Sequence, residues 1–294
     1  MSFFTRNTLV IAIFLTAVST LHAFPPAPYY TIFGDVRNQY GMLLPANGTS
    51  VILYEGSREV LRQPLVDSGT APYNYQIRMR IDMFRPSTAT YSSLALRSGT
   101  NYTLAVNIGG QLFSPIEMRT TPSVGSPADR RRLDLTLGID SDGDGIPDAW
   151  KEAQLFHAGI EPGPDGWDLS LIDRDGDFNG DGISNWHHYI AGTYATIPGS
   201  FLKLEIINMV GSFPKLQFYA IYGKSYTLEH SEDLKNWQLT EFAMEDPVPV
   251  EDPESMEEPA SVEFQSSHKA TNTGILSIYP EATTPATFYR IIVR

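Results

Sequence analysis

The chain has 294 residues, a formal net charge of −13 at pH 7 and no cysteine. Nucleic-acid binding needs a basic surface, so this charge excludes nucleic acid as a partner. A chain without cysteine has neither disulfides nor a thiol nucleophile, and its small domains need another means of stabilisation. About a third of the acidic residues lie between Asp140 and Asp181, and this concentration requires a cause.

Residues 1–23 have the pattern of a secretory signal peptide. Arg6 precedes an apolar run at 9–18, and Ala23 offers a small residue for cleavage. The run is too short to span a bilayer, and no later segment is apolar enough to do so. We therefore predict a secreted or cell-surface protein with no membrane span in the mature chain; a membrane-tethered N-terminus is the alternative.

Residues 24–138 are predicted to form a β-sandwich module. Short runs rich in β-branched and aromatic residues alternate with turn residues, and from Tyr73 to Ile81 apolar and polar residues alternate strictly. The expected strands are 31–36, 50–55, 73–81, 101–108 and 134–139. The module resembles transthyretin-like or carboxypeptidase-regulatory-like domains, which implies a spacer or binding module. The resemblance rests on Gly34-Asp35-Val36, Gly41, Leu44, Ala46, Val51, Leu53 and residues 102–106.

Residues 139–199 form a different segment, with acidic loops and two predicted helices. The first helix follows Pro147, which suits a first helical position, and runs to Gly159. The second follows Ser184, a favourable N-cap, and stops at Gly192. Each helix comes directly after an acidic loop.

The first loop predicts a calcium site. Calcium takes six to eight oxygens, and a tight loop turns alternate carboxylates inward together. Numbered from Asp140, the loop has a glycine at position 6, where a sharp turn is needed. The predicted ligands are Asp140, Asp142, Asp144, the carbonyl of Ile146 at position 7, and Asp148 at position 9.

This stretch resembles the calcium loop of thrombospondin type 3 repeats. Trp150 stands where those repeats have a cysteine, in agreement with a cysteine-free chain. Lys151 occupies position 12, where the family has a bidentate acid. The resemblance therefore implies that water, Glu152 or an acid of the second loop completes the coordination.

The second loop allows two numberings. Starting from Asp173, the ligands are Asp173, Asp175 and Asp177, and Phe178 must make the sharp turn. Starting from Asp177, Gly182 makes the turn, and this numbering is preferred for that reason. The ligands are then Asp177, Asn179, Asp181, the carbonyl of Ile183, and Asn185, with His188 at position 12. Asp173 and Asp175 are then free to reach the first loop, because adjacent loops of the resembled family share ions.

Residues 200–294 return to a β pattern, interrupted by an acidic, proline-rich segment at 244–260 that is predicted to be a surface loop. The module resembles small C-terminal β-domains of modular secreted bacterial proteins, on the pattern from Tyr226 to Trp237 and the closing Phe288-Tyr289-Arg290. That resemblance carries no activity. We expect Trp237 to pack into the core.

No common catalytic motif is present. The chain lacks H-E-x-x-H, G-x-S-x-G and a phosphate loop. His187 and His188 are adjacent, so on a helix they point about 100° apart and cannot chelate one ion together. The sequence thus predicts a mostly β, non-catalytic protein: two β-sandwich-like modules joined by a calcium-binding loop–helix segment, structural or adhesive, with a surface protein or polysaccharide as partner. The alternative is a carbohydrate-binding or accessory module for polysaccharide degradation, with Tyr73 and Tyr75 as candidate aromatics.

Overall fold

The computed structural model describes residues 27–67, 71–83, 92–247, 262–281 and 287–294. Within these residues the chain is mostly β, as predicted, with two α-helices. The predicted signal peptide at 1–23 and most of the segment at 244–260 lie outside the described residues. No helix in the described part of the chain is long and apolar enough to cross a membrane.

The N-terminal module consists of two four-stranded sheets that enclose one hydrophobic core. One sheet has the order β6-β5-β1-β9, and the other has the order β4-β3-β7-β8. The first contains β1 (Tyr30–Gly34), β5 (Tyr75–Ile81), β6 (Ala95–Leu96) and β9 (Arg130–Arg132), and the second contains β3 (Thr49–Glu55), β4 (Arg58–Pro64), β7 (Thr103–Ile108) and β8 (Gln111–Phe113). A short parallel pair, β2 (Val36–Arg37) and β10 (Leu135–Thr136), leads from this module toward the connector.

Strand β5 shows why the alternation in the sequence produces this arrangement. Tyr75, Ile77, Met79 and Ile81 are buried, and the residues between them are partly or fully exposed. Because successive side chains of a strand point to opposite faces, one face of β5 lies on the core. Tyr75 is thus a core residue, and its ring is not available to bind a carbohydrate.

The C-terminal module is also built from two sheets around its own core. One has the order β11-β12-β18-β15-β16; the other is centred on β13, which pairs with β14, β17 and β19. The strands are β11 (Glu205–Val210), β12 (Phe213–Ala220), β13 (Ser225–Ser231), β14 (Gln238–Thr240), β15 (Phe242–Ala243), β16 (Phe264–Gln265), β17 (His268–Lys269), β18 (Gly274–Pro280) and β19 (Phe288–Val293).

The tryptophan expected in this core lies at its edge instead. Tyr226 and Leu228 are buried in the core as expected. Trp237 is half-buried, and the guanidinium of Arg290 lies over its ring at 4.3 Å. The turn before it is exposed, with Leu234 in a left-handed conformation at φ 62°. Trp237 is therefore not a member of the buried core, and its ring contacts Arg290 of β19.

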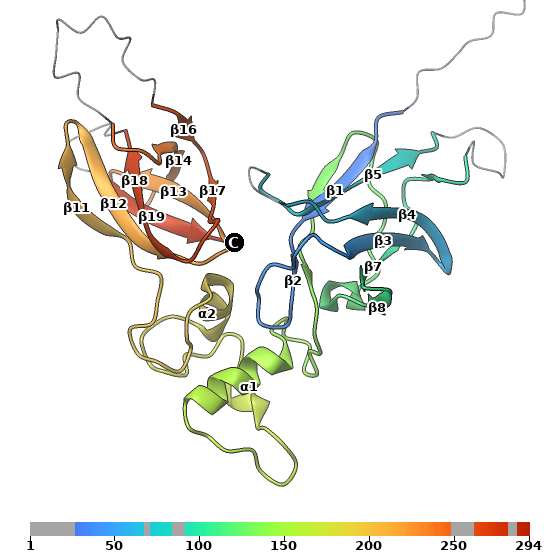
Figure 1. Ribbon diagram of the computed structural model, residues 1–294, viewed down its shortest axis with the longest axis horizontal. Helices are drawn as coiled ribbons and strands as arrows, with labels where there is room; N and C mark the ends of the chain where they lie inside the picture. Colours follow the sequence, from blue (N-terminus) through green and yellow to red (C-terminus); the bar gives the residue numbers. More distant parts are fainter. Residues whose placement is uncertain (1–26, 68–70, 84–91, 248–261, 282–286) are drawn as a thin grey trace, which may run out of the picture.

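The connector has a third core of its own. Helix α1 (Asp148–His157) and helix α2 (Asn185–Ala191) flank it, with the short 3-10 helix η2 (Leu169–Leu171) between them in sequence. Trp150 is buried and packs edge-on against Tyr189, with ring centroids 5.4 Å apart. The other buried members are Ile146, Leu155, Ile172 and Ala195. Figure 1 shows both helices below the β-modules, with α2 beneath the C-terminal module and α1 lower still.

The two β-modules also contact each other directly. The carboxylate of Asp35, at the end of β1, is fully buried and accepts the Nζ of Lys269 from β17 at 2.5 Å. Arg37 and Arg132 each approach the same carboxylate at 3.2 Å. Arg37 also donates to the carbonyl of Gly223 at 3.0 Å. A buried ionic cluster thus joins modules that are far apart in sequence.

Candidate metal centre

The first loop (residues 140–151) and the second loop (residues 177–188) have the same backbone arrangement. In each, the aspartate at position 1 accepts N–H groups from positions 4 and 6. Asp140 accepts from Gly143 at 2.8 Å and from Gly145 at 3.1 Å. Asp177 accepts from Gly180 at 2.9 Å and from Gly182 at 2.7 Å.

The remaining positions repeat as well. The N–H of position 5 donates to the side chain at position 3, that of position 7 to position 5, and that of position 2 to position 9. In the first loop these bonds are Asp144 to Asp142, Ile146 to Asp144 and Ser141 to Asp148, and in the second they are Asp181 to Asn179, Ile183 to Asp181 and Phe178 to Asn185. Two different sequences therefore fold around one loop plan.

The turn positions agree with numbering the second loop from Asp177. Gly145 and Gly182, both at position 6, have φ of +91° and +87°. This left-handed region favours glycine, because a Cβ would crowd the backbone. Phe178 does not have positive φ, so the sharp turn that numbering from Asp173 requires is not at Phe178.

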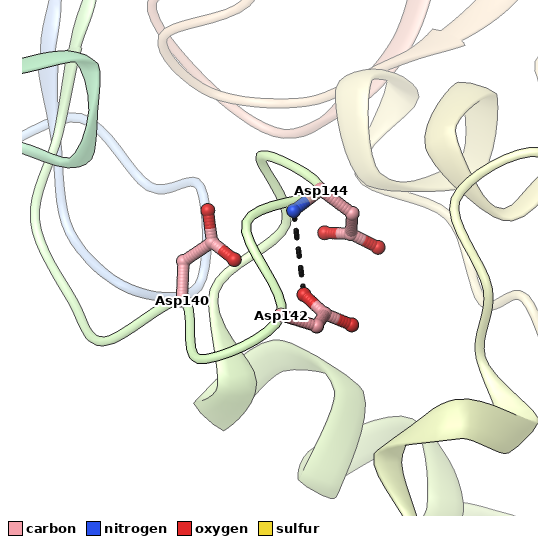
Figure 2. A group of neighbouring side chains, drawn as sticks. All are labelled: Asp140, Asp142 and Asp144. Atoms are coloured by element: carbon pink, nitrogen blue, oxygen red, sulfur yellow. Dashed lines mark hydrogen bonds between the residues drawn. The ribbon is translucent and has the colours of Figure 1, made fainter. Parts of the chain in front are cut away.

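Three carboxylates gather in the first loop (Figure 2). Asp140, Asp142 and Asp144 each place a carboxylate oxygen within 4.8 Å of the others, and this cluster could hold a metal ion. Asp140 is buried, Asp144 is partly buried and Asp142 is exposed. Within the described residues no other group of three acids or histidines comes this close.

The position-12 residue of the first loop supplies a cation to this cluster. Lys151, on α1, has a side chain that is 0% exposed, and its Nζ lies 2.6 Å from Asp142 Oδ2 and 2.8 Å from Asp144 Oδ2. Burial alone would lower the pKa of Lys151, but the hydrogen bonds and charges of the two aspartates outweigh it and raise the pKa. Burial likewise acts to raise the pKa of Asp142, but the hydrogen bond and charge of Lys151, together with the hydrogen bond from the Asp144 N–H, outweigh it and lower the pKa. The ammonium therefore neutralises much of the cluster.

Two arginines complete the surroundings of the first loop. Arg119, at the end of η1 (Ile116–Arg119), lies 3.3 Å from Asp140 Oδ2. Arg174 donates from Nη1 to the carbonyl of Asp144 at 2.5 Å, and its guanidinium lies 3.4 Å from the ring centroid of Trp186. The first loop is thus surrounded by protein cations, and its carboxylates do not repel one another unopposed.

The second loop has a histidine where the first has the lysine. His188, on α2, is buried, whereas the adjacent His187 is exposed, as the helical spacing predicted. The imidazole Nε2 of His188 lies 3.6 Å from Asp181 Oδ1. Asn179 Nδ2 donates to the other oxygen of Asp181 at 3.0 Å and to the carbonyl of Ile197 at 3.1 Å.

Asp173 and Asp175 do not join either carboxylate group. Both are exposed, and Asp173 Oδ1 accepts the N–H groups of Asp175 and Gly176 in a turn of its own. The residue that connects the loops is Arg174, between them in sequence. The sequence predicted that Asp173 and Asp175 reach the first loop. In the structure the residue that reaches it is Arg174, whose guanidinium donates to the carbonyl of Asp144.

The sequence marked Lys151 and His188 only as departures from an acidic position 12. The signal was position 12 itself, because a residue in the first turn of the helix after such a loop can point its side chain back into the loop. That both side chains are buried against position 5 became visible only in the structure.

No protein-family model, curated protein or solved structure matches the chain.

Proposed function

We propose that this is an exported, non-catalytic modular protein whose two β-modules are held by a calcium-binding connector. The observation that supports it most is the shared loop plan, in which two acidic loops with one hydrogen-bond pattern enclose a separate core. That core is small, and no disulfide reinforces it. An ion that binds only the folded connector adds stability by mass action.

Calcium is the ion that suits the first loop. Asp140, Asp142 and Asp144 offer only oxygen, and calcium tolerates irregular oxygen geometry. To bind there, calcium must displace the ammonium of Lys151 from two of the three carboxylates. We therefore expect weak binding, in the roughly 10⁻⁴–10⁻³ M range of extracellular modules.

Thermal unfolding in millimolar calcium and in chelator tests the calcium dependence. We expect a higher midpoint in calcium, and equal midpoints would contradict the proposal. Calorimetric titration then locates the site with a matched pair of variants. Asp144→Ala should abolish first-loop binding, whereas Asp165→Ala should not, because Asp165 is an exposed residue of the segment between the loops.

The contacts between the modules support a role for the whole molecule. A buried ionic cluster and a connector with its own core join the two sandwich-like modules, which suits a structural or adhesive protein at a cell surface or in a matrix. A glycan array and a surface-protein pull-down, both in calcium, test the partner. Binding to polysaccharide alone would favour the accessory-module alternative.

A further inference from the structure

The imidazole of His188 is held in place but incompletely bonded. The residue is 1% exposed, and its Nδ1 lies 2.8 Å from the hydroxyl oxygen of Thr193. Its Nε2 is fully buried and has no hydrogen-bond partner. The 3.6 Å from Nε2 to Asp181 Oδ1 is longer than a hydrogen bond. A buried polar atom without a partner is costly and requires an explanation.

Comparison with the first loop indicates what is missing. Lys151 and His188 occupy position 12 of the two loops, and each side chain is buried beside the position-5 aspartate. In the first loop the ammonium supplies the positive charge. Within the described residues no lysine or arginine forms an ion pair with Asp177 or Asp181. The second loop therefore keeps aspartates at positions 1 and 5, has Asn179 at position 3, and in the described part of the chain has no ammonium or guanidinium paired with these aspartates.

We propose that the second loop binds a zinc-class or first-row transition-metal dication, with His188 Nε2 as its position-12 ligand. Imidazole nitrogen is a ligand for zinc, copper, iron, nickel and cobalt, whereas calcium takes oxygen ligands. The inference uses the loop plan described above, but it does not depend on calcium binding in the first loop. It assigns different ions to the two loops.

The residues around His188 fit this assignment. A neutral imidazole that donates Nδ1–H to Thr193 has its lone pair on Nε2, the tautomer that ligates. Asp181 supplies an oxygen beside that nitrogen. Asn179 Oδ1 and the carboxylate of Asp177 line the same loop, and each carboxylate oxygen has lone pairs beyond those that the backbone uses.

Cobalt(II) is a suitable probe, because its visible absorption reports nitrogen coordination. We would titrate the mature full-length protein with cobalt chloride and with calcium chloride, monitored by absorption and calorimetry. Asp142→Asn impairs metal binding by the first loop, so that the titration reports binding by the second loop. His188→Gln removes the proposed ligand, and His187→Gln is the matched control, because His187 is the adjacent exposed histidine of the same helix.

We expect Asp142→Asn and His187→Gln to bind cobalt like the parent protein. Affinity should fall at least about tenfold in His188→Gln, and by about 10–100-fold in Thr193→Val, which removes the partner that orients the ring. His188→Glu should weaken cobalt binding and strengthen calcium binding. In case His188→Gln does not fold, ¹⁵N spectra of the parent provide a second readout: zinc should shift the Nε2 resonance of His188 and not that of His187.

Cobalt affinity that is equal in His188→Gln and the parent would overturn the proposal, as would an unchanged Nε2 resonance in zinc. Failure of the calcium function would look different. In that case calcium would not stabilise the parent, while Asp142→Asn would still bind cobalt through His188.

Discussion

Replacing Lys151 with methionine tests how the first loop is stabilised. Methionine keeps an unbranched apolar side chain but removes the charge that lies 2.6 Å from Asp142 and 2.8 Å from Asp144. We expect Lys151→Met to destabilise the protein in chelator and to strengthen its calcium binding. Both effects have the same cause, because the ammonium and calcium compete for the same two carboxylates.

The structure sets the size of the effect. A hydrogen bond between charged groups contributes about 1.5–3 kcal/mol. The Asp142 side chain is 46% exposed, so its bond is discounted for solvent screening, while the Asp144 side chain is only 16% exposed. We expect a total loss of about 2–3 kcal/mol in chelator. At roughly 2–4 °C per kcal/mol, the melting midpoint should fall by roughly 4–12 °C.

The gain in calcium affinity should match that loss. If calcium must displace the ammonium, removing the ammonium returns about 2–3 kcal/mol to binding, or roughly 30–150-fold in affinity. Calorimetry measures this, with Lys203→Met as the control. Lys203 is exposed and pairs with Glu205 at 2.5 Å, so its loss should cost under about 1 kcal/mol. Unchanged stability of Lys151→Met in chelator, or weaker calcium binding, would refute the reasoning.

The ion pair between Lys151 and Asp142 predicts how the stability of the protein in chelator depends on pH. The pKa of Lys151 is raised, so its contribution is complete below the unfolded value near 10.5 and is lost as pH rises through the folded pKa. The pKa of Asp142 is lowered, so its contribution is complete above about 3.8 and is lost as pH falls through the folded pKa. We expect this contribution to be constant between about pH 5 and 9. Stability measured by denaturant at several pH values, for the parent and Lys151→Met, gives the difference directly.

Three further outcomes are expected. Gly182→Val should disrupt metal binding by the second loop, because a β-branched residue disfavours the φ of +87° there. Phe178→Ala should cost packing only. Equal metal titrations of the two variants would contradict the numbering from Asp177. Lys224 is buried directly before β13, and this burial, followed by the charge of Arg37, lowers its pKa to about 7. The unfolded chain therefore binds more protons than the folded chain between about pH 7 and 10. The free energy of unfolding should rise with pH in this range by up to about 1.4 kcal/mol per pH unit, and denaturant titrations of Lys224→Met should lack this rise. Lys269→Met removes the ion pair between the modules, so the two β-modules should unfold in separate calorimetric transitions; a single unchanged transition would show that this pair does not couple them.

Local sequence patterns specify the class of fold and the hydrogen-bond plan of the two loops. Strict alternation from Tyr75 to Ile81 specifies a strand with one buried face, since side chains of a strand alternate with a period of two. Glycine at position 6 of each loop specifies a sharp left-handed turn, since few other residues adopt it at low cost. These are local preferences, and they act wherever the segment lies.

Packing between distant segments determines which side chains complete each loop and how the modules meet. Sequence spacing presents Lys151 and His188 only as gaps in a ligand set, because it shows neither burial nor distance. Packing of α1 and α2 on the connector core buries both side chains beside an aspartate, one as a bound ammonium and one with a free nitrogen. The contact of Asp35 with Lys269 joins residues 234 positions apart. No local pattern encodes such a contact, because it forms only when two separately folded modules pack together.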